Sequence, residues 1–101
     1  EDDFRDDLAE YLVANTECEI EITPGTSEGK PDILVDDLLA LELKNNPSKA
    51  ELDRCVGQCM SYSREWVTWI VLIDSPPSKV GRLERLLADK GLERLLVWRF
   101  V

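Results

Sequence analysis

The chain has no histidine, and this absence removes several kinds of chemistry at once. Histidine is the common general base near neutral pH and the central member of serine and cysteine catalytic triads, so both mechanisms are excluded. Cysteine is also scarce, because Cys18, Cys55 and Cys59 are one fewer than a four-cysteine zinc or iron–sulfur site requires. We expect Cys55 and Cys59 to be reduced residues on a buried helix face of a cytoplasmic protein.

Long apolar runs are missing as well. The longest lies within Trp66–Ile73, which is the length of a strand and far short of the roughly 20 residues that span a membrane. No signal-peptide pattern is present. We therefore expect no membrane association and, at 101 residues, a single domain over residues 1–101. The absent initial methionine and an end inside a strand pattern leave open trimmed ends or one domain of a longer protein.

Positive charge is the third shortage, since 12 Lys and Arg residues stand against 21 Asp and Glu residues, a net charge of −9. This balance opposes binding to anionic partners, whose affinity normally depends on cationic contacts. Two interpretations remain open. The acids lie on outward helix faces, as at Asp2, Asp3, Asp6 and Asp7, and leave a binding site neutral or basic. Alternatively, the chain comes from a halophile, where 1 M salt screens charge over about 3 Å.

The most informative segment that is present runs from residue 31 to residue 44 and reads PDILVDDLLALELK. Strand-forming residues, Ile33–Val35 and Leu38–Leu43, flank an acidic pair, which predicts two antiparallel strands joined by a tight turn. If the turn centres near Asp37, Asp32 lies opposite Glu42. Directly opposed residues have Cβ atoms roughly 4.5–5.5 Å apart, close enough for two carboxylates to share a divalent ion.

Alternation along the second strand decides which side chains accompany this pair. Glu42 and Lys44 share one face of the sheet, whereas Leu41 and Leu43 point to the other face, into apolar packing. Two carboxylates and an ammonium group are therefore expected together on a rigid sheet.

Pro31, Asp32, Glu42 and Lys44 resemble the signature of the PD-(D/E)xK nuclease superfamily, the restriction-endonuclease-like proteins that include archaeal Holliday-junction resolvases and RecB-like nuclease domains. The resemblance implies that the two acids bind Mg²⁺, with Mn²⁺ as a substitute, and that the lysine orients or activates water. It thus implies a magnesium-dependent DNA nuclease, with RNA as an open alternative. The chemistry is consistent, because a bound metal polarises a phosphoryl oxygen and a nearby lysine stabilises the developing charge.

A helix is predicted from Lys49 to Glu65, with Ser48 as N-cap and Glu51 as its capping-box partner. Gln58 and Tyr62 lie one turn apart at the edge of its apolar stripe. They resemble the Q-x-x-x-Y element of RecB-like nucleases, which implies a supporting catalytic role for Gln58. The candidate contacts to nucleic acid are Lys30, Lys49, Arg54 and Tyr62.

The first helix is predicted over Glu1–Val13, with Phe4 and Leu8 on its apolar stripe. Helical spacing places Glu1 on that stripe, and the resemblance implies that it is a third metal ligand. The alternative is that Glu1 only favours the helix dipole, as any acid in a first turn does.

The remaining elements complete an α/β fold. Strands are predicted over Cys18–Thr23, over Trp66–Ile73, which should be central and covered on both faces, and over Leu95–Val101. A helix begins near Pro77, and Gly91 is its expected C-terminal cap. The order α-β-β-β-α-β-α-β resembles the restriction-endonuclease-like fold, a mixed sheet flanked by helices.

Three functions remain open. The first is a magnesium-dependent DNA nuclease that is structure-specific, acts as a homodimer or belongs to a larger protein. The second is a catalytically silent nucleic-acid-binding module of the same fold. The third is an acidic interaction domain, unrelated to nucleic acid, whose hairpin carboxylates are solvated surface charge.

Overall fold

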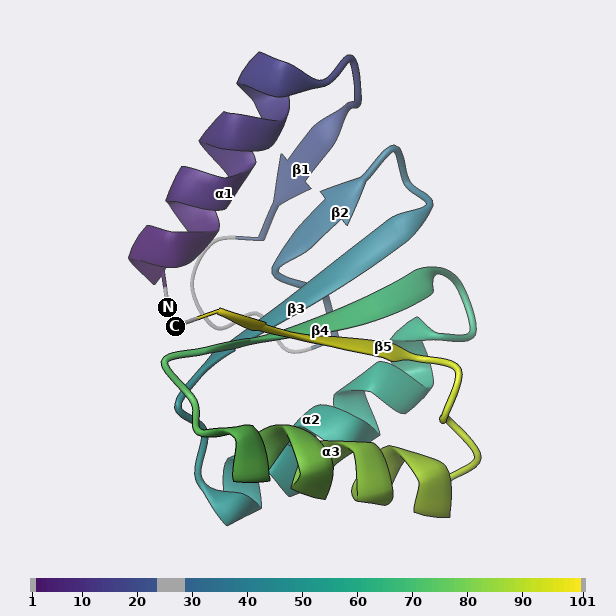
Figure 1. The fold of residues 1–101 in the computed structure, drawn as a ribbon. Coiled ribbons are helices and arrows are strands. Elements are labelled where there is room, and N and C mark those ends of the chain that lie inside the picture. Colours follow the sequence, from purple (N-terminus) through teal and green to yellow (C-terminus); the bar gives the residue numbers. More distant parts are fainter. Residues whose placement is uncertain (1, 24–28, 101) are drawn as a thin grey trace.

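A computed structural model describes residues 2–23 and 29–100, and it contains the elements in the predicted order (Figure 1). They are α1 (Asp2–Asn15), β1 (Ile20–Ile22), β2 (Ile33–Val35), β3 (Leu39–Asn45), α2 (Lys49–Tyr62), β4 (Val67–Ile73), α3 (Pro77–Asp89) and β5 (Leu96–Phe100). No helix in these described ranges is long and apolar enough to cross a membrane. The α/β class and the order α-β-β-β-α-β-α-β are confirmed.

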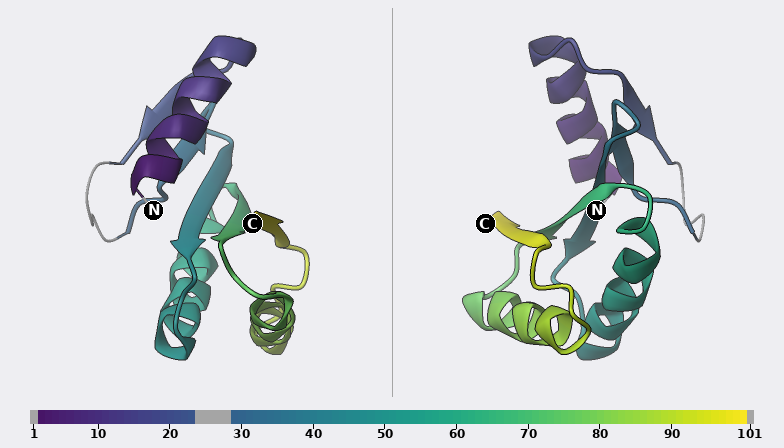
Figure 2. Two further views of the ribbon diagram at one scale, coloured as in Figure 1. Left: turned by 60° about the vertical axis from the view of Figure 1, so that its left-hand side comes forward. Right: turned by 90° about the vertical axis from the view of Figure 1, so that its right-hand side faces the viewer.

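The five strands form one mixed sheet in the spatial order β1-β2-β3-β4-β5. The first three strands are antiparallel, whereas β3, β4 and β5 are parallel. Parallel neighbours need crossover connections, and α2 and α3 supply them. The helix α1 covers one face of the sheet, and α2 and α3 cover the other (Figures 1 and 2).

The hairpin between β2 and β3 has the predicted acidic turn. Asp36 and Asp37 both have φ of 53°, and the Leu38 N–H donates to the Val35 carbonyl at 2.9 Å. Aspartate tolerates this left-handed conformation better than most residues. Two successive positive φ angles match the twist of the flanking strands, so the acidic pair sets where the hairpin folds back.

Each helix of the second half has one end where it was predicted. Ser48 and Glu51 form a reciprocal capping box at the start of α2. Gly91, with φ of 71°, lies just beyond α3 in the conformation that terminates helices. The helix α2 ends at Tyr62, earlier than predicted, because the next N–H groups, those of Arg64 and Glu65, bond to carbonyls only three residues back.

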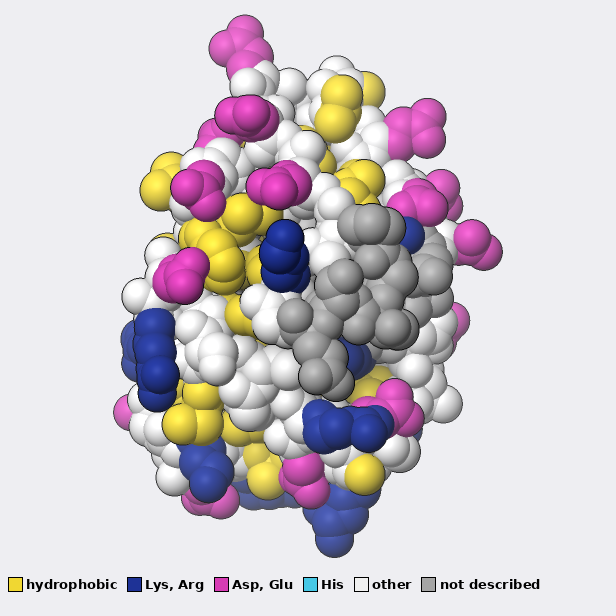
Figure 3. All heavy atoms as spheres, turned by 180° about the vertical axis from the view of Figure 1, so that it is seen from behind, with side chains coloured by type: hydrophobic (Ala, Val, Ile, Leu, Met, Phe, Trp, Pro, Cys, Tyr) yellow, Lys and Arg dark blue, Asp and Glu magenta, His cyan; other side chains and the backbone are white. Residues whose placement is uncertain are grey.

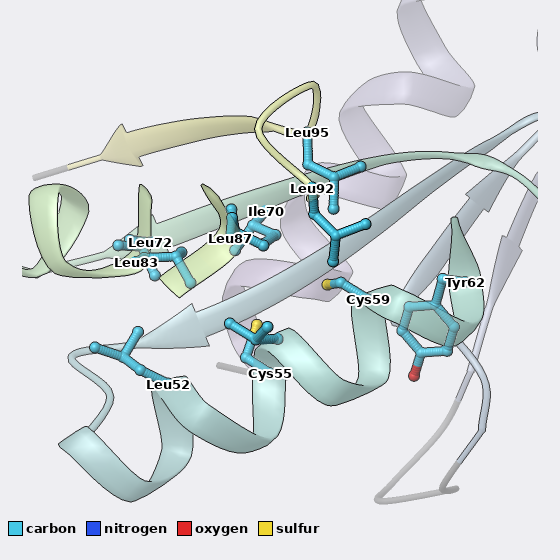
Figure 4. Close-up of a cluster of buried hydrophobic side chains, with 11 residues drawn as sticks. Leu52, Cys55, Cys59, Tyr62, Ile70, Leu72, Leu83, Leu87, Leu92 and Leu95 are labelled. Carbon is cyan, nitrogen blue, oxygen red and sulfur yellow. The ribbon is translucent and has the colours of Figure 1, made fainter. Parts of the chain in front are cut away.

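Each face of the sheet has its own core. The α2 and α3 face buries the cluster shown in Figure 4, whose members include Leu52, Cys55, Cys59, Tyr62, Ile70, Leu72, Leu83 and Leu87. The α1 face buries Ala9, Ile33, Leu41, Leu43, Val71 and Ile73. Leu41 and Leu43 therefore point away from α2, as the alternation along β3 predicts.

The strand β4 is not covered along its whole length, and that expectation was wrong. Its second half is buried, but Val67 is 65% exposed and Trp69 is half-buried. The physical reason is the position of α1, which makes most of its contacts with β1 at the far end of the sheet. The α1 face of β4 and β5 therefore has little cover.

Candidate functional site

The register of the hairpin brings the two predicted carboxylates together. Ile33 pairs with Leu41, and the next step of the same antiparallel register sets Asp32 opposite Glu42. The Leu43 backbone N–H donates to Asp32 Oδ2 at 2.8 Å, which fixes the orientation of this carboxylate. Directly opposed residues project from the same face of a sheet. Asp32 and Glu42 thus form the predicted pair.

Glu42 is 3% exposed, so its carboxyl group lies in a poorly solvated position. Burial, the charge of Asp32 and a hydrogen bond between the two carboxyl groups together raise the pKa of Glu42 to about 9. A carboxyl group in such surroundings is disfavoured in its charged form. At neutral pH Glu42 therefore holds a proton, and a divalent cation can take the place of that proton.

Lys44 completes the group on the same face. Its Nζ lies 3.9 Å from Glu42 Oε2, and its side chain is 20% exposed. The ammonium group therefore lies between the buried Glu42 carboxyl group and solvent. Asp32, Glu42 and Lys44 meet as the alternation and the turn predict.

The helix α2 covers the site and contributes two thiols to its wall. Cys55 and Cys59 are fully buried thiols, as expected of reduced core residues (Figure 4). A hydrogen bond with Cys55 and burial raise the pKa of Cys59, and the nearby charge of Glu42 acts in the same direction. The Cys59 thiol therefore stays protonated, and the two side chains form a wall of low polarity.

Gln58 lies on the edge of α2 that also carries Tyr62. Its Oε1 is buried and has no hydrogen-bond partner within the part of the chain that the structure describes. A buried amide oxygen without a donor costs about 1–3 kcal/mol. Such an atom is expected to meet a donor that arrives with a ligand or with water.

Tyr62 was predicted to contact nucleic acid, but its environment favours a positioning role. It is 2% exposed, and its hydroxyl donates to the Lys30 carbonyl at 2.8 Å. Burial raises the pKa of Tyr62, followed by the charge of Glu42. This hydrogen bond joins α2 to Lys30, two residues before Asp32. Tyr62 therefore fixes the position of the chain just before the site. The Lys30 residue itself is exposed.

The two cations predicted on α2 lie in different places. Hydrogen bonds with Ser48 lower the pKa of Glu51, and the charges of Arg54 and Lys44 also lower it. The side chains of Arg54 and Lys44 therefore lie near Glu51. Arg54 is therefore on the rim of the site. Lys49 is exposed, but helical spacing places it half a turn away from Gln58, on the opposite side of α2.

The described carboxylates suit Mg²⁺ better than a metal ion whose ligands all come from the protein. Among the described residues, no group of three His, Cys, Asp or Glu side chains is arranged to hold a metal ion. Mg²⁺ is usually bound by one or two carboxylates together with water and substrate phosphates. Asp32 and Glu42 supply two. The predicted third ligand, Glu1, lies outside the described residues.

Charge is distributed very unevenly over the molecule. Residues 3–21 carry seven acids and one base, Arg5, whereas residues 79–99 carry six bases and three acids. Figure 3 shows acidic side chains concentrated over the upper part of the molecule, around α1 and β1, and most basic side chains toward α2 and α3. The net charge of −9 is therefore concentrated away from the helix that closes the site.

Two hydrogen bonds of the site could not be predicted from the sequence. The amide of Leu43 and the carbonyl of Lys30 are backbone groups, which patterns of side chains do not reveal. The proximity of Cys55 to Glu42 had a weak signal, since Cys55 lies one turn before Gln58 on the same helix. Comparisons of the chain with protein-family models, curated proteins and solved structures found no match.

Proposed function

We propose that this chain is a magnesium-dependent nuclease that hydrolyses phosphodiester bonds in DNA, with Asp32, Glu42 and Lys44 at its centre. The observation that carries the proposal is the buried Glu42 opposite the half-buried Asp32, with an ammonium group 3.9 Å from Glu42. Burying an acid beside a second acid destabilises a fold unless a cation compensates the charge. We therefore expect this site to bind a cation. The mixed sheet and its order of elements are in keeping with a restriction-endonuclease-like fold.

Asp32 and Glu42 would hold Mg²⁺, and Mn²⁺ should replace it. The bound ion would polarise a phosphoryl oxygen and lower the pKa of a water molecule. Lys44 places its charge where negative charge develops during hydrolysis. The Gln58 Oε1, which lacks a partner among the described residues, would accept a hydrogen bond from the attacking water and orient it.

The charge distribution supports an approach of DNA from the α2 side. Acidic residues on α1 and β1 repel phosphates, whereas Arg54 and the exposed Lys30 lie near the site. Tyr62 keeps the Lys30 segment in place from within the core. RNA remains an alternative substrate, and a cleavage assay that includes RNA distinguishes it from DNA.

A catalytically silent binding module is the second candidate, because only two carboxylate ligands are present among the described residues. It predicts metal and nucleic-acid binding without cleavage. The acidic interaction domain is the weakest alternative. It requires solvated carboxylates, and Glu42 is 3% exposed.

The test is a cleavage assay with labelled single-stranded, duplex and branched DNA, and with RNA, in Mg²⁺, Mn²⁺ or EDTA at low and high salt. The wild type should cleave DNA only with metal. Asp32→Asn should abolish cleavage, because it removes a charge but retains an acceptor for the Leu43 amide. Asp53→Asn, an equal change at an exposed position of α2, is the matched control.

Cleavage by the wild type and by Asp53→Asn, but not by Asp32→Asn, supports the nuclease. Metal-independent cleavage, or equal activity of all three proteins, would contradict it. Binding without cleavage on every substrate would favour the silent module.

A further inference from the structure

A strip of hydrophobic side chains lies on the α1 face of β5. Leu96, Trp98 and Phe100 alternate along the strand and are 49%, 45% and 49% exposed. The Trp98 ring lies 5.6 Å from that of Trp69 on β4, so the strip continues onto the neighbouring strand. Monomeric proteins seldom expose contiguous apolar surface of this kind without an interaction to cover it.

The strip continues into a groove of about 290 Å³ between α1 and the sheet. Nine residues line it and all are hydrophobic, with Leu8 and Leu12 forming a wall on α1 and Trp69, Trp98 and Phe100 forming the far side. We call this surface the β4–β5 groove. The ring of Phe4 lies 5.7 Å from that of Phe100, where the start of α1 meets the end of β5 (Figure 1). The groove contains no polar side chain that would recognise a small polar ligand.

The width of the uncovered area indicates the shape of its occupant. Two helices cover the opposite face of the sheet, whereas α1 is the one described helix on this face (Figure 2). The two strands left with little cover, β4 and β5, are together about 10 Å wide, since neighbouring strands lie about 4.8 Å apart. A helix with its side chains is about 10 Å across. The groove therefore has room for one helix beside α1.

The border of the groove is acidic on two sides. Asp3 and Asp7 are exposed and lie on α1 beside Phe4 and Leu8. Asp74, which is exposed, lies at the end of β4, where its N–H donates to the Phe100 carbonyl. A second copy of the chain would bring these acids together and would add a net charge of −9 to a net charge of −9.

We propose that the β4–β5 groove binds one amphipathic helix of a partner, with hydrophobic residues along one stripe and Lys or Arg beside it. The stripe fills the groove, and the flanking cations meet Asp3, Asp7 and Asp74. This site is on the opposite face of the sheet from Glu42 and is independent of the proposed nuclease activity.

The probe is a synthetic helical peptide as long as α1, 14 residues, with leucines at helical spacing and lysines beside them. A second peptide has glutamate in place of each lysine, and a third has the lysine peptide's composition in scrambled order. Binding to the 101-residue chain is measured by anisotropy of a label on the peptide. The lysine peptide should bind about tenfold or more tightly than either control, and its affinity should fall as salt rises.

Trp98→Asp should weaken binding of the lysine peptide about tenfold or more, as should Leu96→Asp. Val13→Asp is the matched control, because Val13 is 63% exposed and faces away from the groove on α1. All three variants add one negative charge, so general attraction to the acidic protein would strengthen binding in each. Circular dichroism and thermal unfolding establish that each variant is folded.

Three results would overturn the proposal. One is no binding of the lysine peptide to the wild type, and another is equal binding of the lysine and glutamate peptides. The third comes from sedimentation velocity: a wild-type dimer that Trp98→Asp dissociates would assign the groove to a second copy of the chain.

Discussion

The two faces of the sheet are made by the same strands but differ in what they bury. On β3, Glu42 and Lys44 point toward α2, whereas Leu41 and Leu43 point toward α1. The face with two helices thus encloses a carboxylate pair. The face with one helix is apolar and leaves Trp98 and its neighbours in contact with water.

Each face therefore departs from the arrangement that would stabilise the fold most. An acid, Glu42, is buried on the face that two helices cover, and hydrophobic side chains such as Trp98 are exposed on the other face. Local conflicts of this kind tend to occur at functional sites, because stability is given up there for binding or chemistry. Two separate functional surfaces on opposite faces are the simplest explanation.

The largest effect should come from the buried part of the apolar face. Leu43 is fully buried, so Leu43→Ala should lower the free energy of unfolding by about 2–5 kcal/mol. Trp98→Ala on the same face should cost on the order of 1 kcal/mol, since it loses mainly its contact with Trp69. Urea unfolding measures both. Equal losses would show that β5 is packed as firmly as β3, which would remove the contrast between core and groove.

On the charged face, Lys44→Ala should reduce metal-dependent cleavage about 100- to 1000-fold, because the charge beside the carboxylates is lost. The fold should survive, since the side chain is partly exposed. Lys49→Ala is the matched control, and it should cleave like the wild type because Lys49 lies on the opposite side of α2 from Gln58. The comparison requires initial rates on the preferred DNA at saturating Mg²⁺. Loss of activity in both variants would indicate general attraction to DNA instead.

Glu42→Gln should stabilise the metal-free protein by roughly 1–2 kcal/mol at pH 8. Burial raises the pKa of Glu42 from 4.5 to about 9 in the folded state, so the unfolded chain gives up its proton first. Stability of the wild type should therefore fall as pH rises from 4.5 to about 9, and the variant should lose this dependence. Thermal unfolding in EDTA across that range measures it.

Glu51→Gln is the control for this experiment, and it should act in the opposite direction. Hydrogen bonds with Ser48 lower the pKa of Glu51, so its stabilising contribution is present above the ordinary pKa and is lost as pH falls. Mg²⁺ should raise the melting temperature of the wild type more than that of Glu42→Gln. An unchanged pH profile in Glu42→Gln would mean that the carboxyl pair is not the destabilising group.

The smallest effect should come from Tyr62→Phe. It removes the hydroxyl that donates to the Lys30 carbonyl and should cost about 1 kcal/mol of stability. If the bond positions Asp32, cleavage should fall while metal affinity changes little. Tyr11→Phe, at a 61% exposed position, should change neither quantity. A loss of stability with unchanged cleavage would limit Tyr62 to a structural role.

The elements of the fold were predictable because their signals are local. Period-2 alternation and the acidic pair set the hairpin and its register, and the Ser48 capping box set the start of α2. The pairing of Asp32 with Glu42 followed from this register. The burial of Tyr62 and the exposure of β5 did not, because both depend on how distant segments pack.

The sequence by itself determined the order of the elements, the hairpin and the side of β3 on which Glu42 and Lys44 project, because backbone geometry and side-chain period are properties of neighbouring residues. Tertiary structure alone decided that α1 lies toward β1 and that α2 covers the carboxylates. Burial, pKa shifts and grooves arise where segments far apart in the chain meet, so the raised pKa of Glu42 and the β4–β5 groove exist only in the folded protein.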